Sequence, residues 1–191
     1  PCGALQTSVV LAAHASVELV WLLGEAGTTQ AAQAMIARWR DEDVDVALQS
    51  VRADWSAVLD TVTVRTPDRA FDLMLNGWLL YQVLACRVWA RSAFYQSSGA
   101  YGFRDQLQDT MALILAKPAL AREHLLRAAG RQFLEGDVQH WWLPQTGRGV
   151  RTRVSDDRVW LGYCVAHYVE TTADAGVLDE VVPFLDGPTL Q

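Results

Sequence analysis

The segment from Phe71 to Phe94 predicts a helix that is apolar almost all round, and this constrains the fold more than any other feature of the chain. Thr66-Pro67-Asp68 directly precedes it and supplies a capping residue, a proline for the first helical position and an early acidic side chain. A helix without a polar face is buried on most sides and does not lie on a surface. The sequence therefore predicts that other elements pack around this helix.

The chain before this helix changes its pattern at Gly24. In residues 5–23 apolar side chains recur with a period near two, which predicts strand. Two helices follow: Thr28 or Thr29 can cap the first, and apolar residues at steps of three and four indicate an amphipathic helix across 41–62. We therefore expect a β region followed by a helical connector.

Three further helices are predicted after the apolar one. Residues 104–116 form the first, which stops at Pro118, and this proline opens a second helix through Phe133. The next stretch, 135–152, has no regular pattern, and so long a connection inside a compact domain indicates a functional segment. Ser155 then caps the third helix. Helices joined by alternating short and long loops indicate an α/α toroid.

Composition and charge exclude several classes of function. The 191 residues are 51% hydrophobic and 20% charged, as in ordinary globular proteins, and the net charge of −6 argues against non-specific nucleic-acid binding. Cys2, Cys86 and Cys164 are odd in number and far apart, so neither a disulfide framework nor a zinc site is indicated. The run Val9–Leu23 is too short and polar to span a membrane, and no signal peptide is visible. Because the first residue is Pro1 rather than Met, we expect a processed, truncated or partial product.

The first candidate site follows a small loop that contains Gly99. Arg104, Asp105, Gln108 and Asp109 place a guanidinium, two carboxylates and an amide within about one and a half helical turns. Such groups are suited to binding a polyhydroxylated molecule. Alternatively, Asp105 is an ordinary first-turn acid, and Asp105 and Asp109 form a carboxylate pair that faces water. The residues alone leave both interpretations open.

The second candidate is the tryptophan pair in residues 135–142. Eight tryptophans in a chain of this length fit either a dense core or a carbohydrate cleft. Trp141 and Trp142 stand beside Gln139 and His140, so an indole could stack on a sugar while the polar groups bind its hydroxyls. Alternatively, Trp141 or Trp142 is a hydrophobic plug beneath the loop. His140 is not expected to bind a metal, because no second His or Cys lies at ligand spacing.

The third candidate is the arginine-rich stretch 147–157. Arg148, with Arg151 and Arg153, could bind an anion such as phosphate. Asp156 and Asp157 could serve as acid and base. Equally, the arginines could pair with neighbouring carboxylates, Glu135 among them, to hold the loop, and the two aspartates could simply cap the following helix.

Six ordered segments of the chain resemble glycoside-hydrolase family 94, the inverting phosphorylases that act on β-linked glucosides. Within that family the resemblance is to members that handle β-1,2-glucan, and it spans nearly the whole chain. The segments that carry it are 66–96, 99–109, 135–142, 147–161, 166–174 and 178–188.

The resemblance implies a mainly α fold. It implies the end of a β-sandwich domain in residues 1–25, a helical linker in 26–64, and the first half of an (α/α)6 catalytic barrel in 65–191. Inner helices of such a barrel are buried against neighbours on both sides. Half a barrel is therefore expected to pack on the remainder of its own chain, or to self-associate through its exposed flanks.

The resemblance also assigns roles to residues. The Asp of the family's G-[FY]-R-D motif binds the glucosyl unit in the −1 subsite, and Asp105 falls on that position, with Arg104 beside it. Gln139, His140 and Trp142 are expected on the acceptor-side wall. The general acid of similar members lies in a later G-D-W-N-D-type motif, which does not occur in this sequence, and the phosphate-binding residues also lie further along. No catalytic residue is therefore expected within this chain.

The implied activity is phosphorolysis of β-1,2-glucan oligosaccharides, with inorganic phosphate as co-substrate and neither cofactor nor metal. Cellobiose and chitobiose phosphorylases carry Arg where this sequence has Gly99, which argues against cellobiose as substrate. The isolated chain is expected to be inactive, and the full-length protein to reside in the cytoplasm or on the cytoplasmic side of the inner membrane. Two alternatives stay open: a non-catalytic glucan-binding module, and a structural fragment that folds only with its complement.

Overall fold

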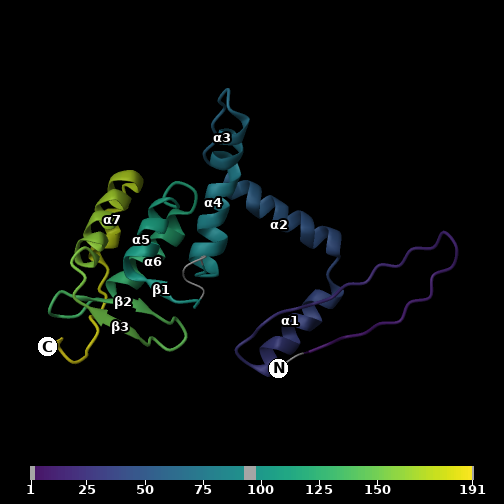
Figure 1. The fold of residues 1–191 in the computed structure, drawn as a ribbon, viewed down its shortest axis with the longest axis horizontal. Coiled ribbons are helices and arrows are strands. Elements are labelled where there is room, and N and C mark those ends of the chain that lie inside the picture. The colour runs from purple at the N-terminus through teal and green to yellow at the C-terminus, as the bar shows by residue number, and fades with distance from the viewer. Residues whose placement is uncertain (1–2, 93–97, 191) are drawn as a thin grey trace. The chain divides into compact units, whose positions relative to one another are not determined.

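The computed structural model describes residues 3–92 and 98–190, and these residues are mainly helical with a small three-stranded sheet (Figure 1). The chain separates into two compact units, Pro1–Val51 and Arg52–Gln191. The expectation of a mainly α fold is confirmed, whereas closure of the helices into an (α/α)6 barrel stays a prediction. No helix within the described ranges is both long and apolar enough to cross a membrane.

The first unit contains α1 (Thr29–Asp41) and the beginning of α2 (Val44–Leu59). Thr28 caps α1 as expected, because its hydroxyl accepts a hydrogen bond from the Ala31 N–H at 3.2 Å. The expectation of strand in 5–23 is wrong for this structure, since that segment forms no paired strand and exposes its apolar side chains. A period of two predicts which side chains share a face, but a strand also needs a partner whose backbone groups it can bind.

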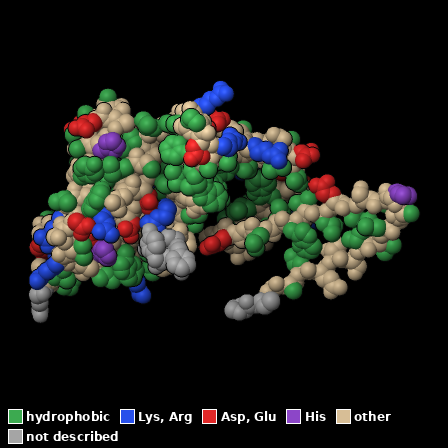
Figure 2. Space-filling view, turned by 45° about the horizontal axis from the view of Figure 1, so that its top comes forward, with side chains coloured by type: hydrophobic (Ala, Val, Ile, Leu, Met, Phe, Trp, Pro, Cys, Tyr) green, Lys and Arg blue, Asp and Glu red, His purple; other side chains and the backbone are tan. Residues whose placement is uncertain are grey.

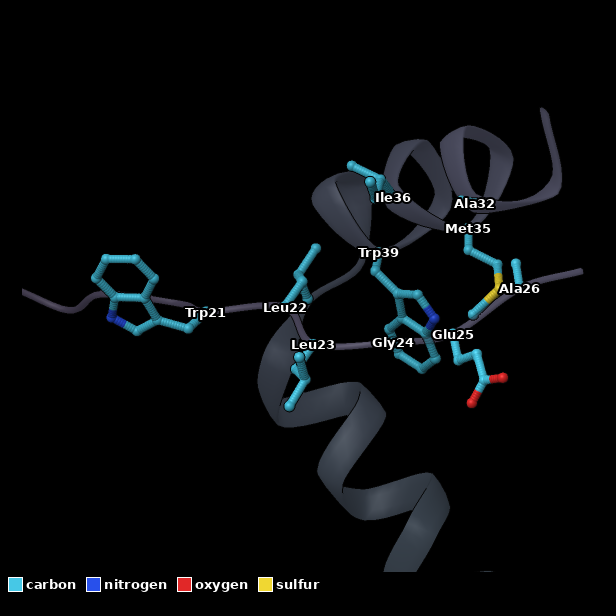
Figure 3. Close-up of a pocket in the computed structure, with 10 residues that line it drawn as sticks. All are labelled: Trp21, Leu22, Leu23, Gly24, Glu25, Ala26, Ala32, Met35, Ile36 and Trp39. Atoms are coloured by element: carbon cyan, nitrogen blue, oxygen red, sulfur yellow. The ribbon is translucent and has the colours of Figure 1, made fainter. Parts of the chain in front are cut away.

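A pocket of about 500 Å³ lies between α1 and the extended segment 21–26. Met35 and Trp39 of α1 point toward this segment near Gly24 (Figure 3). A Cβ at Gly24 would lie 3.6 Å from Cε of Met35, so the segment packs on α1 at van der Waals distance. The extended segment is therefore held by apolar contact with a helix rather than by strand pairing.

The apolar helix consists of four consecutive segments that alternate between α and π geometry: α3 (Arg69–Leu73), Met74–Trp78, α4 (Leu79–Tyr81) and Gln82–Trp89. Asp68, not Thr66, is its N-cap, and the Asp68 carboxylate accepts hydrogen bonds from two backbone N–H groups at 2.9 and 3.3 Å. Pro67 therefore precedes the helix instead of opening it. The helix ends at Trp89, before the expected end at Phe94, which itself lies outside the described residues.

This helix is buried on one side, where Leu84 and Val88 pack with Val58 of α2. Many of its other apolar side chains, Phe71 and Trp78 among them, are about half exposed, so the expectation of burial on most sides is wrong for the described residues. Hydrophobic side chains are visible over much of the face drawn in Figure 2. The apolar pattern predicts that the helix has neighbours, but it does not specify which residues supply them.

The main core lies in the second unit and is built by three helices: α5 (Phe103–Met111), α6 (Pro118–Ala129) and α7 (Asp157–Thr172). Phe103 and Leu107 of α5 are fully buried. The Cys164 thiol of α7 lies 3.6 Å from the Leu107 carbonyl oxygen, which shows that α5 and α7 are in direct contact.

The ends of these helices agree with expectation in part. Pro118 opens α6 as predicted. In contrast, α5 ends at Met111 rather than at 116, and the N-cap of α7 is Asp156 rather than Ser155. A short 3-10 helix, Ala175–Asp179, follows α7.

The segment 135–152, expected to be irregular, is an antiparallel hairpin of β2 (Val138–Trp142) and β3 (Gly149–Thr152), and β1 (Tyr101–Gly102) pairs with the other edge of β2. Pairing joins β2 to β1 although both α5 and α6 lie between them in the chain, and such a long-range contact leaves no local pattern in the sequence.

The register of the hairpin shifts between Gln139 and Trp141, so that His140 is the extra residue of a β-bulge. At the far end of the hairpin Gly149 pairs with Trp142, and a Cβ on Gly149 would lie only 1.9 Å from the Trp141 carbonyl oxygen. Any side chain at position 149 would therefore push the two strands apart.

We expect Gly149→Ala to lower the free energy of unfolding by about 1–3 kcal/mol, the usual cost of overpacking. Gly162→Ala is the matched control, since a Cβ on Gly162 of α7 meets nothing within 4 Å. It should stabilise the protein by about 0.4–1 kcal/mol, because alanine favours the helix and lowers the conformational entropy of the unfolded chain. Chemical denaturation of both variants measures the difference, and equal effects would contradict the close approach of the two strands.

Candidate functional site

The starts of α5 and α7 bring together three of the predicted site residues. Arg104 lies in the first turn of α5, and its Nη1 donates a hydrogen bond to Oδ2 of Asp156 at 2.8 Å. Its Nη2 lies 3.7 Å from Oδ1 of Asp105. Arg104 and Asp156 are 52 positions apart in sequence, and they meet because α5 packs on α7.

The bulge residue His140 lies against the same helix start. Its Nδ1 is 2.7 Å from Oδ2 of Asp157, the first residue of α7. The Asp157 side chain is 1% exposed, and its Oδ1 has no hydrogen-bond partner among the described residues, whereas His140 is 39% exposed. We call the five residues at the two helix starts and the bulge the polar cluster: Arg104, Asp105, His140, Asp156 and Asp157.

The polar cluster carries more negative than positive charge, because three carboxylates accompany one guanidinium. The hydrogen bond between Arg104 and Asp156 raises the pKa of the guanidinium and lowers the pKa of the carboxyl, so both stay ionised near neutral pH. A surplus of carboxylates repels an inorganic anion, whereas hydroxyl groups can bind to donors and acceptors alike. The arrangement therefore suits a neutral polyhydroxylated molecule better than phosphate.

Buried polar groups behind the cluster fix the start of α5. The Gly102 N–H donates to Oε1 of the buried Gln106, and a Cβ on Gly102 would lie 2.8 Å from Oδ2 of Asp105. Arg87 Nε donates to Oδ2 of Asp109 at 2.9 Å, and the pKa of Asp109 is nevertheless raised, chiefly because the carboxyl is buried. Sequence analysis missed Gln106 and Arg87. For Gln106 a signal existed: it lies on the apolar face of α5, where a buried amide needs partners.

Trp142 and Gln139 do not line a surface, which corrects the expectation that they form an acceptor-side wall. Trp142 is 0% exposed, and its ring centroid lies 5.4 Å from the ring centroid of Tyr101. Arg131 Cζ lies 5.2 Å from the centroid of the Trp142 ring. The buried Gln139 donates through Nε2 to the Gly147 carbonyl oxygen at 3.0 Å and so holds the hairpin turn. Trp142 is therefore the hydrophobic plug that the sequence left open as an alternative.

Three other predicted residues are exposed: Gln108, Trp141 and Arg148. Among the described residues, none of the three makes a hydrogen bond or an ion pair with the polar cluster. Trp141 is 36% exposed, so part of this residue stays accessible, as stacking on a sugar requires.

The arginines of 147–157 do not converge on an anion site. Arg151 donates from Nε and Nη2 to the Asp137 carboxylate at 2.6 and 2.7 Å, and from Nη2 to Glu135 at 2.8 Å. Arg153 donates to the Leu190 carbonyl oxygen at 2.5 Å. The expected phosphate cradle is wrong for this structure, and the alternative pairing of an arginine with Glu135 is confirmed. The described residues include no group of three or more His, Cys, Asp or Glu placed to hold a metal ion.

Comparison with known proteins identifies the class to which this fold and site belong. Residues 54–190 match the family described as the glycosyl hydrolase 94 superfamily, catalytic domain, and residues 1–42 match the glycosyl hydrolase 94 supersandwich domain. The chain therefore belongs to glycosyl hydrolase family 94.

Individual relatives include a glucan synthase and several phosphorylases. The chain is 50% identical over 190 residues to the cyclic beta-(1,2)-glucan synthase NdvB of Rhizobium meliloti (strain 1021), covering 100% of this chain and 7% of that protein. It is 27% identical over 215 residues to N,N'-diacetylchitobiose phosphorylase of Vibrio furnissii, covering 97% and 27%. It is 28% identical over 114 residues to 1,2-beta-oligoglucan phosphorylase of Listeria innocua serovar 6a, covering 57% and 10%. The chain thus spans only a small part of the length of each relative.

The burial of Trp142 and the exposure of Trp141 predict different effects of truncation. We expect Trp142→Ala to lower the free energy of unfolding by about 3–5 kcal/mol, because it leaves a large cavity in the core. Trp141→Ala should cost about 1 kcal/mol or less, since its ring is partly exposed. Denaturation curves of both variants test this, and a smaller loss for Trp142→Ala than for Trp141→Ala would contradict the assignment of Trp142 as the plug.

Proposed function

We propose that this chain forms the sugar-binding part of an inverting phosphorylase that cleaves β-1,2-linked glucan with inorganic phosphate. The polar cluster carries the proposal, because it offers a guanidinium donor beside carboxylate and imidazole acceptors at two converging helix starts. Membership of the family, together with phosphorylases among the relatives, supports an enzyme of the glycosyltransferase type.

In the proposed reaction a phosphate oxygen forms a bond to the anomeric carbon while the glycosidic C–O bond breaks, and a general acid gives its proton to the leaving oxygen. No base is needed, because phosphate is already an anionic nucleophile. Asp105 and Arg104 bind hydroxyls of the glucosyl unit and so orient the anomeric carbon for attack. The general acid and the phosphate-binding groups lie in residues outside this chain, which agrees with a polar cluster that repels anions. The reaction uses no cofactor.

The preference for β-1,2 linkages is supported by the names of two relatives, a cyclic beta-(1,2)-glucan synthase and a 1,2-beta-oligoglucan phosphorylase. The loop before α5 adds a physical argument. Gly99 has a φ of +72°, a backbone conformation that other L-residues adopt only with strain. An arginine at this position, which the resemblance gives for cellobiose phosphorylases, would therefore strain this loop.

Asp105→Asn in the full-length protein tests both the function and the site. We expect the wild type to release glucose 1-phosphate from β-1,2-glucooligosaccharides only when phosphate is present. The variant should lose about 2–4 kcal/mol of transition-state binding, the scale of a charge-assisted hydrogen bond to substrate. Asp60→Asn, an exposed aspartate away from the cluster, is the control. Wild-type kcat/KM for Asp105→Asn would refute the role of Asp105, and glucan binding without any phosphorolysis would favour a non-catalytic module.

We also propose that further helices of the same protein cover the exposed side of the helix 69–89. The exposed apolar side chains of that helix support this, since contiguous apolar surface of this kind marks a missing interface. Produced alone, the 21.2 kDa chain should self-associate and bind a dye that reports exposed apolar surface. Light scattering and dye fluorescence measure this. A monomer near 21.2 kDa that unfolds cooperatively and binds no dye would contradict the proposal.

A further inference from the structure

The contact between His140 and Asp157 is the most restrained polar contact of the cluster. Asp157 is held at the start of α7 with 1% of its side chain exposed, so its carboxylate cannot turn to water. His140 reaches it because the β-bulge takes this residue out of the regular alternation of β2. The bulge directs the His140 side chain toward the buried Asp157, and this contact fixes the orientation of the imidazole ring.

The buried carboxylate also fixes which ring nitrogen carries a proton. A carboxylate only accepts hydrogen bonds, so the 2.7 Å contact requires Nδ1 of His140 to donate. In the neutral imidazole the proton is then on Nδ1, and Nε2, on the opposite side of a ring that is 39% exposed, presents a lone pair.

We propose that Asp157 is a positioning residue that holds His140 with Nε2 as an acceptor for a hydroxyl group of the glucan. This rests on the function proposed above and adds the direction of one hydrogen bond. A hydroxyl can donate its proton to Nε2 without bringing a negative charge, whereas phosphate brings its charge close to the three carboxylates of the cluster. Arg104, whose Nη1 binds Asp156 beside Asp157, supplies donors for hydroxyl oxygens. The cluster thus matches the two hydrogen-bonding modes of a sugar hydroxyl.

Asp157→Asn in the full-length protein reverses the direction of this hydrogen bond. The new amide can donate to Nδ1, which moves the imidazole proton to Nε2 and removes the acceptor. We expect KM for β-1,2-glucooligosaccharides to rise roughly 10- to 100-fold, the usual effect of losing a residue that orients a functional group. KM for phosphate should not change. Asp179→Asn, an exposed aspartate beyond α7, is the control.

Variants of His140 separate positioning from structural support. In His140→Gln the longer amide can supply an acceptor near the place of Nε2 without help from Asp157, whereas the shorter amide of His140→Asn reaches only the place of Nδ1. We expect His140→Asn to weaken binding of the oligosaccharide as Asp157→Asn does, and His140→Gln to stay within about threefold of the wild type. In the His140→Gln background, Asp157→Asn should have no further effect. His167→Asn, on α7 away from the cluster, is the control.

These variants distinguish failure of the positioning role of Asp157 from failure of the proposed function. A rise in KM for the sugar alone that disappears in the His140→Gln background supports the positioning role. Equal changes in both KM values, or the same loss in both backgrounds, overturns it and leaves the proposed function intact. If Asp157→Asn does not fold, the comparison of His140→Asn with His140→Gln decides, and equal activities of these two variants overturn the proposal. If the wild type releases no glucose 1-phosphate from any β-glucan, the proposed function fails and this inference fails with it.

Discussion

Burial of Trp142 is the constraint on which the rest of the second unit depends. The ring stacks on Tyr101 and lies beside Arg131, and the same residue pairs through its backbone with both β1 and β3. Through its ring and its backbone, this one residue joins β1, directly before α5, to the hairpin that precedes α7. Three members of the polar cluster lie in or directly after the elements that Trp142 joins: Arg104, Asp105 and His140.

The same constraint explains why the functional groups can be arranged so closely. Polar side chains keep a fixed arrangement only when other contacts hold the backbone that carries them. Here Gln106 and Gln139, both buried, bind backbone groups at the start of α5 and at the hairpin turn. The exposed part of the cluster is then free to bind a ligand, because the buried amides, and not the cluster itself, hold the loops.

Local signals in the sequence predicted the features whose causes are local. Thr28 as a helix cap and Pro118 as a helix start depend on residues within one turn, and both are confirmed. Where two neighbouring residues can both cap a helix, the prediction was wrong. The Asp68 carboxylate accepts hydrogen bonds from two backbone N–H groups, so Asp68 and not Thr66 is the N-cap.

Features with distant causes could not be predicted in this way. Two neighbouring tryptophans look alike in the sequence, and only the register of β2 against β1 decides that Trp142 is buried while Trp141 is exposed. The contact of Arg104 with Asp156 depends on the packing of α5 on α7 in the same way. The sequence identified all five members of the polar cluster by their type, but their pairing is a result of the tertiary structure.

The helix 69–89 is connected to the site although much of its surface is exposed. Arg87 of this helix binds Asp109 of α5 at 2.9 Å, and the Gln106 amide donates to the Arg87 carbonyl oxygen at 3.4 Å. Asp109 and Gln106 lie on the helix that begins beside Arg104 and Asp105. Burial disfavours the charged form of Asp109, so the ion pair with Arg87 is sensitive to the position of the guanidinium. A displacement of this helix would therefore reach the start of α5 through the contacts of Arg87 with Asp109 and Gln106.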